Sequence, residues 1–243
     1  MTTQPPSVLV IRHEECSSLG LLKTVVKENH LPIRYLDTPR GDVLSEPISD
    51  YSHLVILGGA ISAYEDKTYP FLQYEFQLIE AAIAQNIPTL GICLGSQILA
   101  KILGASVYRG EMGREVGWHD IQLLEAAIED PLLQQFPKQF KVFQSHQDTF
   151  EIPPGCVRLA QSRQYPNQAF RYQNHVWALQ FHLEMDEIAL NDCSAVIAQE
   201  LIDSRIEDTT IEQMLNEARH CSIAVKPLAD SLMQAFLSVE GVA

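Results

Sequence analysis

The sequence predicts an α/β protein: an open, mostly parallel β-sheet with helices on both faces, an antiparallel extension and a helical C-terminal tail. Short apolar runs alternate with amphipathic helical patterns in the first part of the chain, which is typical of parallel strands joined by helices. Later strand patterns follow one another across short turns, which is typical of antiparallel pairing. Beyond residue 186, strand patterns give way to helical ones.

Four apolar runs predict the parallel strands, and helical patterns lie between them. The predicted strands cover residues 7–11, 33–36, 54–57 and 89–92, and the predicted helices cover 19–29, 69–85 and 96–103. In open α/β sheets, ligand sites lie beyond the carboxyl ends of the strands. Residues that directly follow these runs are therefore candidates for a functional site.

Six further runs predict the antiparallel extension, at residues 106–108, 121–124, 141–143, 157–160, 168–172 and 176–181. Proline, glycine and asparagine at 153–155 and 173–174 provide turns between them. We expect residues 1–186 to form one α/β domain.

The tail, residues 187–243, contains helical patterns at 187–206, 210–220 and 227–239. Thr209 or Thr210 is predicted to cap the second of these helices, with Glu212 or Gln213 completing a capping box. We expect the tail to pack on the same domain; a docking surface for a partner or a twin subunit is the alternative.

Composition excludes several classes of partner. The 243 residues carry a formal net charge of −14, which argues against nucleic acid and anionic membranes. With 46% hydrophobic residues the chain can bury a full core, yet no apolar run approaches the roughly 18 residues that span a bilayer. Residues 1–6 contain no basic region and the apolar run 8–11 is too short for a signal peptide, so we expect a cytoplasmic protein.

Five cysteines, Cys16, Cys93, Cys156, Cys193 and Cys221, occur without a Cys-x-x-Cys pair. An odd number in a chain of this size does not predict a disulfide framework, and a reducing compartment fits. Only Cys93 has an activating context, and the other four are expected to be small core or surface residues. No cluster has the ligand spacing of a metal site, so neither a metal nor another cofactor is expected.

Cys93 lies between the predicted strand 89–92 and the predicted helix 96–103. The pattern Gly-x-Cys-x-Gly is the thiol version of the nucleophile elbow, a tight strand-to-helix turn. Gly91 and Gly95 remove Cβ atoms that would crowd this turn. The N-terminus of the following helix points at the sulfur and stabilises a negative charge there. The pattern predicts that Cys93 is a nucleophile.

A cysteine nucleophile needs a base and a group that orients the base. His182 and Glu184 follow the last predicted strand at i, i+2 spacing, which places both side chains on one side of an extended chain. Glu184 would hold the imidazole in one tautomer and stabilise its charged form. A Cys93–His182–Glu184 triad suits acyl transfer from an amide through a thioester. His146 precedes Asp148 at the same spacing, so His146 is the alternative base.

The predicted strand 54–57 runs into Gly58 and Gly59, whose turn can present bare backbone N–H groups to a developing negative charge. We expect Gly59 to be an oxyanion donor and Gly58 to contact the substrate. The N–H of Leu94, directly after the nucleophile, is the second expected donor. The polar run 13–16 is expected to form a loop before a helix, with a place at the rim of the site as the alternative.

These motifs, in this order, resemble those of the class I, triad-type glutamine amidotransferases, above all the glutaminase domain of GMP synthase and its stand-alone relatives. The matching segments are Gly58-Gly59, residues 91–97 and Gln180-Phe181-His182-x-Glu184, within residues 7–186. The resemblance implies a flavodoxin-like fold and hydrolysis of the small molecule glutamine. This chain shows no synthase domain, so we expect either that the ammonia goes to a separate synthase subunit or that the chain acts alone.

The resemblance also implies which residues bind substrate. Ser145-His146-Gln147-Asp148 looks like the family's Ser-His-x-Asp segment, which helps to hold the α-amino and α-carboxylate groups of glutamine. Gln97 matches a family glutamine that lines the substrate pocket. Gln97, Ser145 and His146 are therefore expected to bind substrate.

Three positions depart from the family pattern. Ala60 replaces a proline after the two glycines, Leu183 replaces a proline between His182 and Glu184, and Gln147 replaces a common glycine. Ala60 leaves the glycine turn freer to move, since proline would fix φ. Gln147 is bulky, which leaves a γ-glutamyl peptide or conjugate open as the substrate. A non-catalytic regulatory subunit is the third, less favoured hypothesis, because the whole triad is present.

Overall fold

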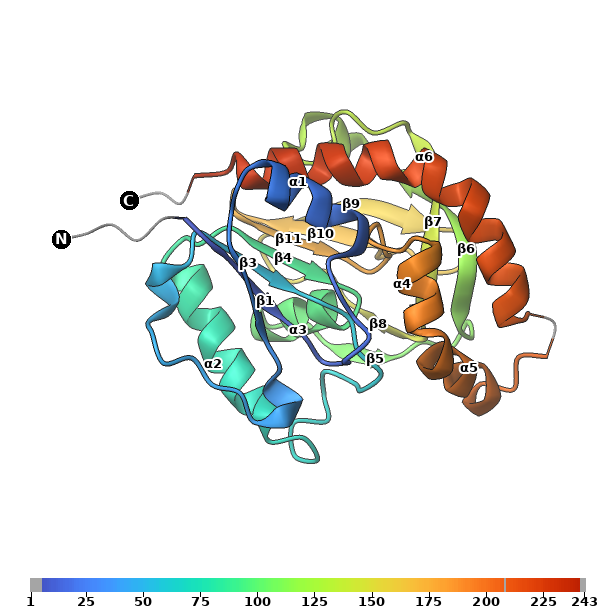
Figure 1. The fold of residues 1–243 in the computed structure, drawn as a ribbon, viewed down its shortest axis with the longest axis horizontal. Coiled ribbons are helices and arrows are strands. Elements are labelled where there is room, and N and C mark those ends of the chain that lie inside the picture. Colours follow the sequence, from blue (N-terminus) through green and yellow to red (C-terminus); the bar gives the residue numbers. More distant parts are fainter. Residues whose placement is uncertain (1–5, 208, 241–243) are drawn as a thin grey trace.

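The computed structural model describes residues 6–207 and 209–240, so parts of the predicted tail (208 and 241–243) lie outside the described residues. Its centre is a nine-stranded sheet in the order β2-β1-β3-β4-β11-β10-β9-β6-β7 (Figure 1). The strands are β1 Val8–Ile11, β2 Ile33–Leu36, β3 His53–Ile56, β4 Thr89–Ile92, β6 Glu115–Leu123, β7 Gln139–His146, β9 Cys156–Ser162, β10 Ala169–Tyr172 and β11 Val176–Leu179. A separate two-stranded sheet pairs β5, Val107–Arg109, with β8, Asp148–Phe150.

The large sheet has a parallel and an antiparallel half. Strands β2, β1, β3, β4 and β11 pair in parallel, and β11, β10, β9, β6 and β7 pair antiparallel. The predicted fold class, including the antiparallel extension, is therefore confirmed. Strand β8 was not predicted; it directly follows β7, and its three residues are too few to show an alternating pattern.

Helices cover both faces of the sheet. They are α1 Lys23–Glu28, α2 Phe71–Ala84, α3 Leu94–Ile102, α4 Glu187–Asp192, α5 Ser194–Asp203 and α6 Ile211–Leu237. Alternate residues of β1 enter different cores: Val8 and Val10 pack with α1 and α6, whereas Leu9 and Ile11 pack with α2 and α3. Every β1 residue is thus buried, as a central parallel strand requires.

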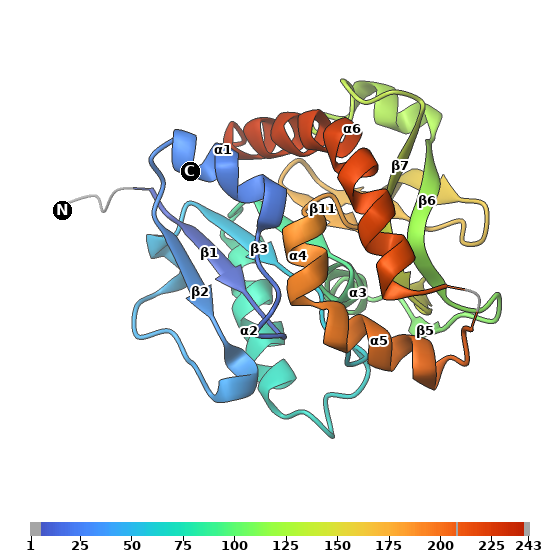
Figure 2. The ribbon, with the colours of Figure 1, turned by 45° about the vertical axis from the view of Figure 1, so that its right-hand side comes forward.

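The tail differs from its prediction in two places. One predicted helix is two, α4 and α5, which meet at Cys193 (Figure 2). Two predicted helices are one, because α6 continues through Pro227. Buried residues on both sides of the proline, such as Val225 and Ala229, anchor α6, so packing outweighs the missing backbone hydrogen bond. The capping box of Thr210 and Gln213 is confirmed.

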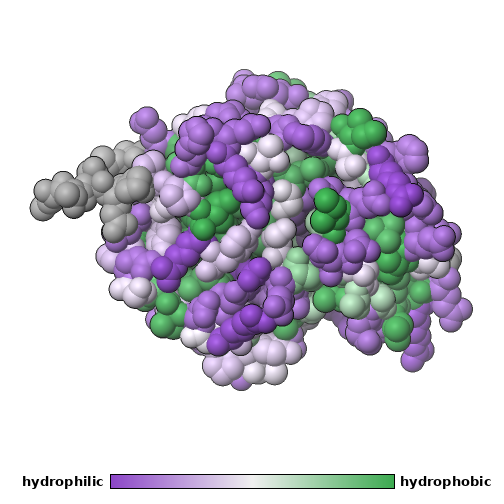
Figure 3. All heavy atoms as spheres, viewed as in Figure 1, coloured by the Kyte–Doolittle hydropathy of each residue, from purple (hydrophilic) through white to green (hydrophobic). Residues whose placement is uncertain are grey.

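The surface agrees with the acidic composition. The face in Figure 3 is mostly hydrophilic, with apolar groups in separate places. Ile188 on α4, Ile202 on α5 and Ile223 on α6 are among the exposed apolar side chains. No helix within residues 6–207 and 209–240 is long and apolar enough to cross a membrane.

Candidate active site

Cys93 occupies a tight turn between β4 and α3. Its backbone has φ 53° and ψ −111°, a conformation that non-glycine residues rarely adopt and that is found preferentially at functional sites. The turn fits because a Cβ on Gly95 would lie 2.2 Å from the carbonyl oxygen of Ile56, so only glycine is tolerated there. The N–H of Cys93 donates to the carbonyl of Leu179 at 2.8 Å, which ties the turn to the end of β11.

His182 and Glu184 form a buried pair just beyond β11. Nδ1 of His182 lies 2.5 Å from Oε1 of Glu184. The chain bends after Leu179 rather than continuing as a strand, and His182 is held by its N–H, which donates to the carbonyl of Phe143 on β7 at 3.0 Å. The two side chains lie side by side as predicted, but the cause is a bend in the chain after β11 and the isolated bridge between Phe143 and His182, not a continuous strand.

The electrostatics of this pair favour a charged imidazole. Burial alone would lower the pKa of His182, but the charges of Glu184 and Cys93 outweigh it and hold that pKa well above its ordinary value of 6.5. Nδ1 faces Glu184, whereas Nε2 has no hydrogen-bond partner among the described residues.

Cys93 and His182 converge at Gly58. A Cβ on Gly58 would lie 3.3 Å from Cβ of Cys93 and 3.3 Å from Cε1 of His182. The glycine turn after β3 therefore borders both side chains. Gly59, next in the turn, packs against Leu94: a Cβ there would lie 3.0 Å from Cδ2 of Leu94. The structure thus brings together Gly58, Gly59, Cys93, Leu94, His182 and Glu184.

A polar cavity of about 240 Å³ opens on one side of Cys93. Gln97, Ser145, His146 and the carboxylate-bearing Asp148 line it, together with Arg109 and Arg114. Gln97 donates to the carbonyl of Asp148 at 3.2 Å. Three of the four predicted substrate residues, Gln97, Ser145 and His146, therefore share this cavity with Cys93, whereas Gly58 lines a different one.

Two residues of the polar cavity, Ser145 and His146, form hydrogen bonds with other groups of the protein. The hydroxyl of Ser145 donates to Glu200 of α5. Nε2 of His146 lies 3.1 Å from Glu115, and its Nδ1 lies 3.0 Å from the carbonyl of Asp148. With both ring nitrogens engaged, His146 is poorly placed to serve as the alternative base.

A second cavity, of about 70 Å³, lies on the His182 side of Cys93 and is largely apolar. Met185, Ala189, Val196 and Ile197 line it, from the segment before α4 and from α4 and α5. Cys93, Ser145 and Glu200 border both cavities. Cys93, the predicted nucleophile, therefore lies between a polar and an apolar cavity.

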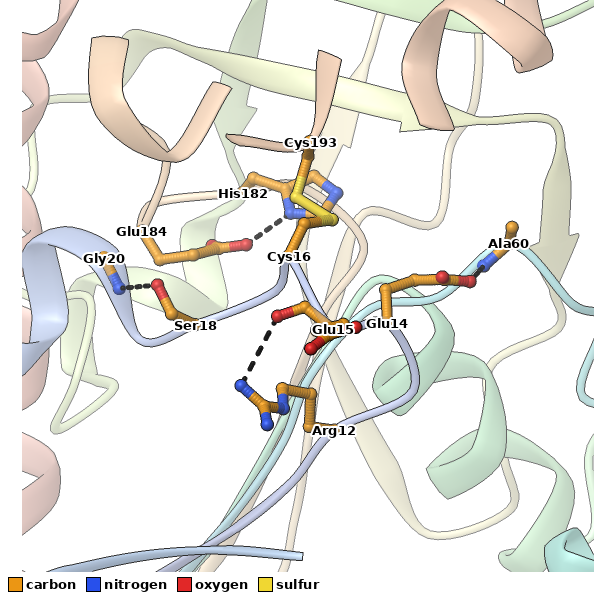
Figure 4. The surroundings of a disulfide bond; sticks show 10 residues. All are labelled: Arg12, Glu14, Glu15, Cys16, Ser18, Gly20, Ala60, His182, Glu184 and Cys193. Carbon is orange, nitrogen blue, oxygen red and sulfur yellow. Dashed lines mark hydrogen bonds and ion pairs between the residues drawn. A yellow bond between two sulfur atoms is a disulfide. The ribbon is translucent and has the colours of Figure 1, made fainter. Parts of the chain in front are cut away.

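A disulfide between Cys16 and Cys193 forms part of the apolar cavity's wall and lies beside His182 and Glu184 (Figure 4). This corrects the expectation that both cysteines are unpaired. They are 177 residues apart, and the fold alone brings the loop after β1 to the junction of α4 and α5. Cys93, Cys156 and Cys221 are free.

The polar run 13–16 forms a loop, as expected, and it also takes the alternative place at the rim, whereas sequence reasoning missed the partner of His13. Glu14 accepts from the N–H of Ala60 at 3.3 Å, so the polar run after β1 does reach the rim. His13, in the same run, is buried against Glu75 of α2. Glu75 lies on the buried face of α2. A carboxylate among the apolar residues of that face could have indicated, from the sequence, that Glu75 has a buried partner. No cluster of three or more His, Cys, Asp or Glu suited to a metal occurs in the described part of the chain.

Comparison with known proteins places this geometry in a family. A model of the family described as "Glutamine amidotransferase class-I" matches residues 19–190. A glutamine amidotransferase crystal structure from Thermotoga maritima aligns with a TM-score of 0.88 and 40% identity, over 96% of this chain and 99% of that one.

Two curated proteins extend the comparison. The glutamine amidotransferase-like protein YfeJ of Salmonella typhimurium is 29% identical over 196 residues, 79% of this chain and 82% of that protein. One subunit of the glutamine-hydrolysing GMP synthase of Pyrococcus abyssi is 38% identical over 102 residues, 41% of this chain. That match spans 52% of the length of the Pyrococcus protein.

Proposed function

The chain belongs to the class I glutamine amidotransferases, and we propose that it hydrolyses the side-chain amide of glutamine to glutamate and ammonia. One observation carries the proposal. Cys93, on its strained turn, and His182, paired with Glu184, meet at Gly58 between two cavities. This is the arrangement of nucleophile, base and orienting group that acyl transfer needs.

In the first half of the reaction, the Cys93 sulfur attacks the amide carbon. A C–S bond forms, and the C=O electron pair moves onto oxygen, where the N–H groups of Gly59 and Leu94 stabilise the charge. His182 carries the thiol proton and donates it to the nitrogen as the C–N bond breaks, which releases ammonia. Glu184 stabilises the charged imidazole throughout.

In the second half, His182 takes a proton from water, and the water oxygen attacks the γ-glutamyl thioester. The same N–H groups hold the second oxyanion. Its collapse breaks the C–S bond, and His182 returns a proton to sulfur. The reaction uses side chains, backbone and water alone.

The polar cavity is the site we assign to the α-amino and α-carboxylate groups of the substrate. Arg109 and Arg114 supply positive charge for the carboxylate, and Asp148 and Glu200 supply negative charge for the ammonium group. Gln97, Ser145 and His146 shape the same cavity. The γ-carbon chain then runs from this cavity to Cys93.

A separate ammonia-accepting synthase subunit is the partner that fits this reaction. One relative is itself named a subunit of a glutamine-hydrolysing GMP synthase. Neither nucleic acid nor a membrane is part of the proposal, given the net charge of −14.

A γ-glutamyl conjugate is the second candidate substrate, and the apolar cavity favours it. A substituent on the amide nitrogen would leave on the side of His182, which protonates that nitrogen. The cavity on this side is walled by Met185, Ala189, Val196 and Ile197, which suit an apolar amine. The products separate the candidates: ammonia from glutamine, or an amine from a conjugate.

The deciding experiment measures ammonia and glutamate release from L-glutamine by the purified protein. Cys93→Ala is the test variant, and Cys156→Ala, at a free cysteine outside both cavities, is the matched control. Release that disappears only in the Cys93 variant supports the proposal. The proposal is contradicted if the protein turns over neither glutamine nor γ-glutamyl-p-nitroanilide and if Cys93 also fails to react with a glutamine-like electrophile.

A further inference from the structure

A buried ion pair lies directly behind the glycine turn. Nε2 of His13 is 3.0 Å from Oε2 of Glu75, and the two side chains are 1% and 0% exposed. The hydroxyl of Thr38 donates to the other carboxylate oxygen. Glu75 otherwise shares its helix face with Leu72 and Ile79, which pack in the apolar core.

Stability alone is a weak reason for such a pair. Burying two charges costs desolvation, and well-packed apolar residues of similar volume often serve stability as well or better. A buried pair therefore calls for a second explanation, which the other side of the imidazole provides.

His13 holds the glycine turn through its remaining nitrogen. Nδ1 lies 3.3 Å from the carbonyl oxygen of Gly58. Both ring nitrogens thus face acceptors, so the ring donates from both. Burial alone would lower the pKa of His13, but the charge of Glu75 outweighs it and raises that pKa, which favours the doubly protonated ring.

The direction of the Gly58 carbonyl fixes the direction of the next N–H. The Gly58–Gly59 peptide is trans, so its C=O and N–H point opposite ways. The carbonyl points at His13, and the N–H of Gly59 therefore points away from it. Gly58 borders Cys93 and His182, and within the described residues no acceptor takes the Gly59 N–H.

The turn needs this external tether. Ala60 does not fix its own φ as proline would, and its N–H is held from outside by Glu14. His13 and Glu14 are adjacent in the sequence, so one loop holds two successive peptide groups of the turn, through the carbonyl of Gly58 and the N–H of Ala60. His13 also packs on it closely: a Cβ on Gly59 would lie 2.6 Å from Cβ of His13.

We propose that His13, anchored by Glu75, is a positioning residue that keeps the Gly58–Gly59 peptide turned so that the Gly59 N–H faces the reacting carbonyl. The inference rests on the proposed amide hydrolysis. A reversed peptide would present the Gly58 carbonyl to the oxyanion, removing one donor and adding a repulsive dipole.

Two substitutions separate this role from a structural one. Asparagine places its amide nitrogen where His13 has Nδ1, and glutamine places it where His13 has Nε2. His13→Asn therefore keeps the donor to Gly58, whereas His13→Gln keeps only the donor to residue 75. Both are made in a Glu75→Gln background, because a lone buried carboxylate would endanger folding.

The asparagine variant should keep kcat within about threefold of the Glu75→Gln parent, whereas the glutamine variant should lose about 100-fold, the usual effect of one oxyanion donor, at nearly constant KM. His175→Gln is the matched control. His175 is also buried, with Nε2 3.2 Å from the carbonyl of Ile83, but it borders neither cavity. Its loss should leave kcat unchanged.

A second measurement uses the γ-aldehyde analogue of glutamate. The Cys93 sulfur adds to the aldehyde carbon, and the C=O electron pair moves to oxygen, so binding reports the oxyanion site. Inhibition should weaken in the glutamine variant as kcat falls, while alkylation by iodoacetamide, which forms no oxyanion, stays constant. Equal kcat in the two His13 variants overturns this inference alone. Wild-type protein without turnover or aldehyde binding overturns the proposed function, and this inference with it.

Discussion

Oε1 of Glu184 lies 2.5 Å from Nδ1 of His182, and both side chains are buried. This contact leaves Nε2 of His182 as the nitrogen available to the sulfur and the leaving group. It also raises the pKa of His182 against the effect of burial, together with the charge of Cys93. Glu184 therefore controls both the tautomer and the charge of the proposed base.

Glu184→Gln should lower kcat by about 100- to 10,000-fold, because the amide keeps the shape but not the charge that stabilises the imidazolium. The pKa of His182 should fall toward 6.5, so the basic limb of the kcat/KM profile should move to lower pH. Steady-state kinetics between pH 5 and 10 measure both effects.

Glu187→Gln is the control for this prediction, since Glu187 is a half-exposed carboxylate on α4 that pairs with Arg219. It should change neither kcat nor the pH profile. A Glu184→Gln enzyme with the wild-type pH profile would contradict the role given to Glu184.

The fold was predictable where a pattern is local. Continuous apolar runs such as Thr89–Ile92 identify buried parallel strands, because every residue of such a strand faces a core. The prediction that one helix ends before Pro227 and another begins there was wrong, because this part of the fold depends on contacts that are distant in the sequence. Proline is a local helix breaker, whereas the contacts that hold α6 through it come from distant strands and α1.

The site divides in the same way. Cys93 with its glycines, and His182 with Glu184, are short-range patterns from which the proposed chemistry can be predicted. His13 with Glu75, Ser145 with Glu200, and Cys16 with Cys193 are partners brought together by topology. No spacing rule connects residues so far apart, so these contacts required the structure.

Reducing the Cys16–Cys193 disulfide should lower the free energy of unfolding by about 2–5 kcal/mol, because the bond closes a loop of most of the chain. Urea unfolding with and without dithiothreitol measures the change. The Cys16→Ser/Cys193→Ser variant should have the unfolding free energy of the reduced wild type, and dithiothreitol should not change it.

Cys221→Ser, at a free cysteine, is the control and should keep the full response to dithiothreitol. Thiol titration of the denatured, unreduced protein should find three of the five cysteines. A count of five would contradict the disulfide.

Acid should loosen the contact between β3 and α6 through His53. Burial lowers the pKa of His53 to about 4, and its ring packs 5.1 Å from that of Phe236. The unfolded chain binds this proton near pH 6.5 and the folded chain only near 4. Stability is therefore full above pH 6.5 and is lost as the pH falls toward 4, by about 3 kcal/mol.

His53→Phe removes the titration and can keep the ring contact, so its unfolding free energy should vary less than that of wild type between pH 6.5 and 4. Chemical denaturation across this range is the measurement. Parallel curves for the two proteins would assign the acid sensitivity to groups other than His53. Glu115 is one such group: burial alone would raise its pKa, but the hydrogen bond and charge of His146 lower it. The stability that Glu115 contributes is therefore lost only as the pH falls below about 4.5.

The apolar cavity predicts how substrates can be separated. Val196→Trp, from α5, should fill the space on the leaving-group side of Cys93. It should reduce kcat/KM for γ-glutamyl-p-nitroanilide by about tenfold or more, because the aromatic amine loses its room, while the small ammonia from glutamine still leaves. Ile202→Trp, at an exposed position of the same helix, is the matched control. Equal losses for both substrates in the Val196 variant would mean that the leaving group does not enter this cavity, and the conjugate hypothesis would then have no structural support.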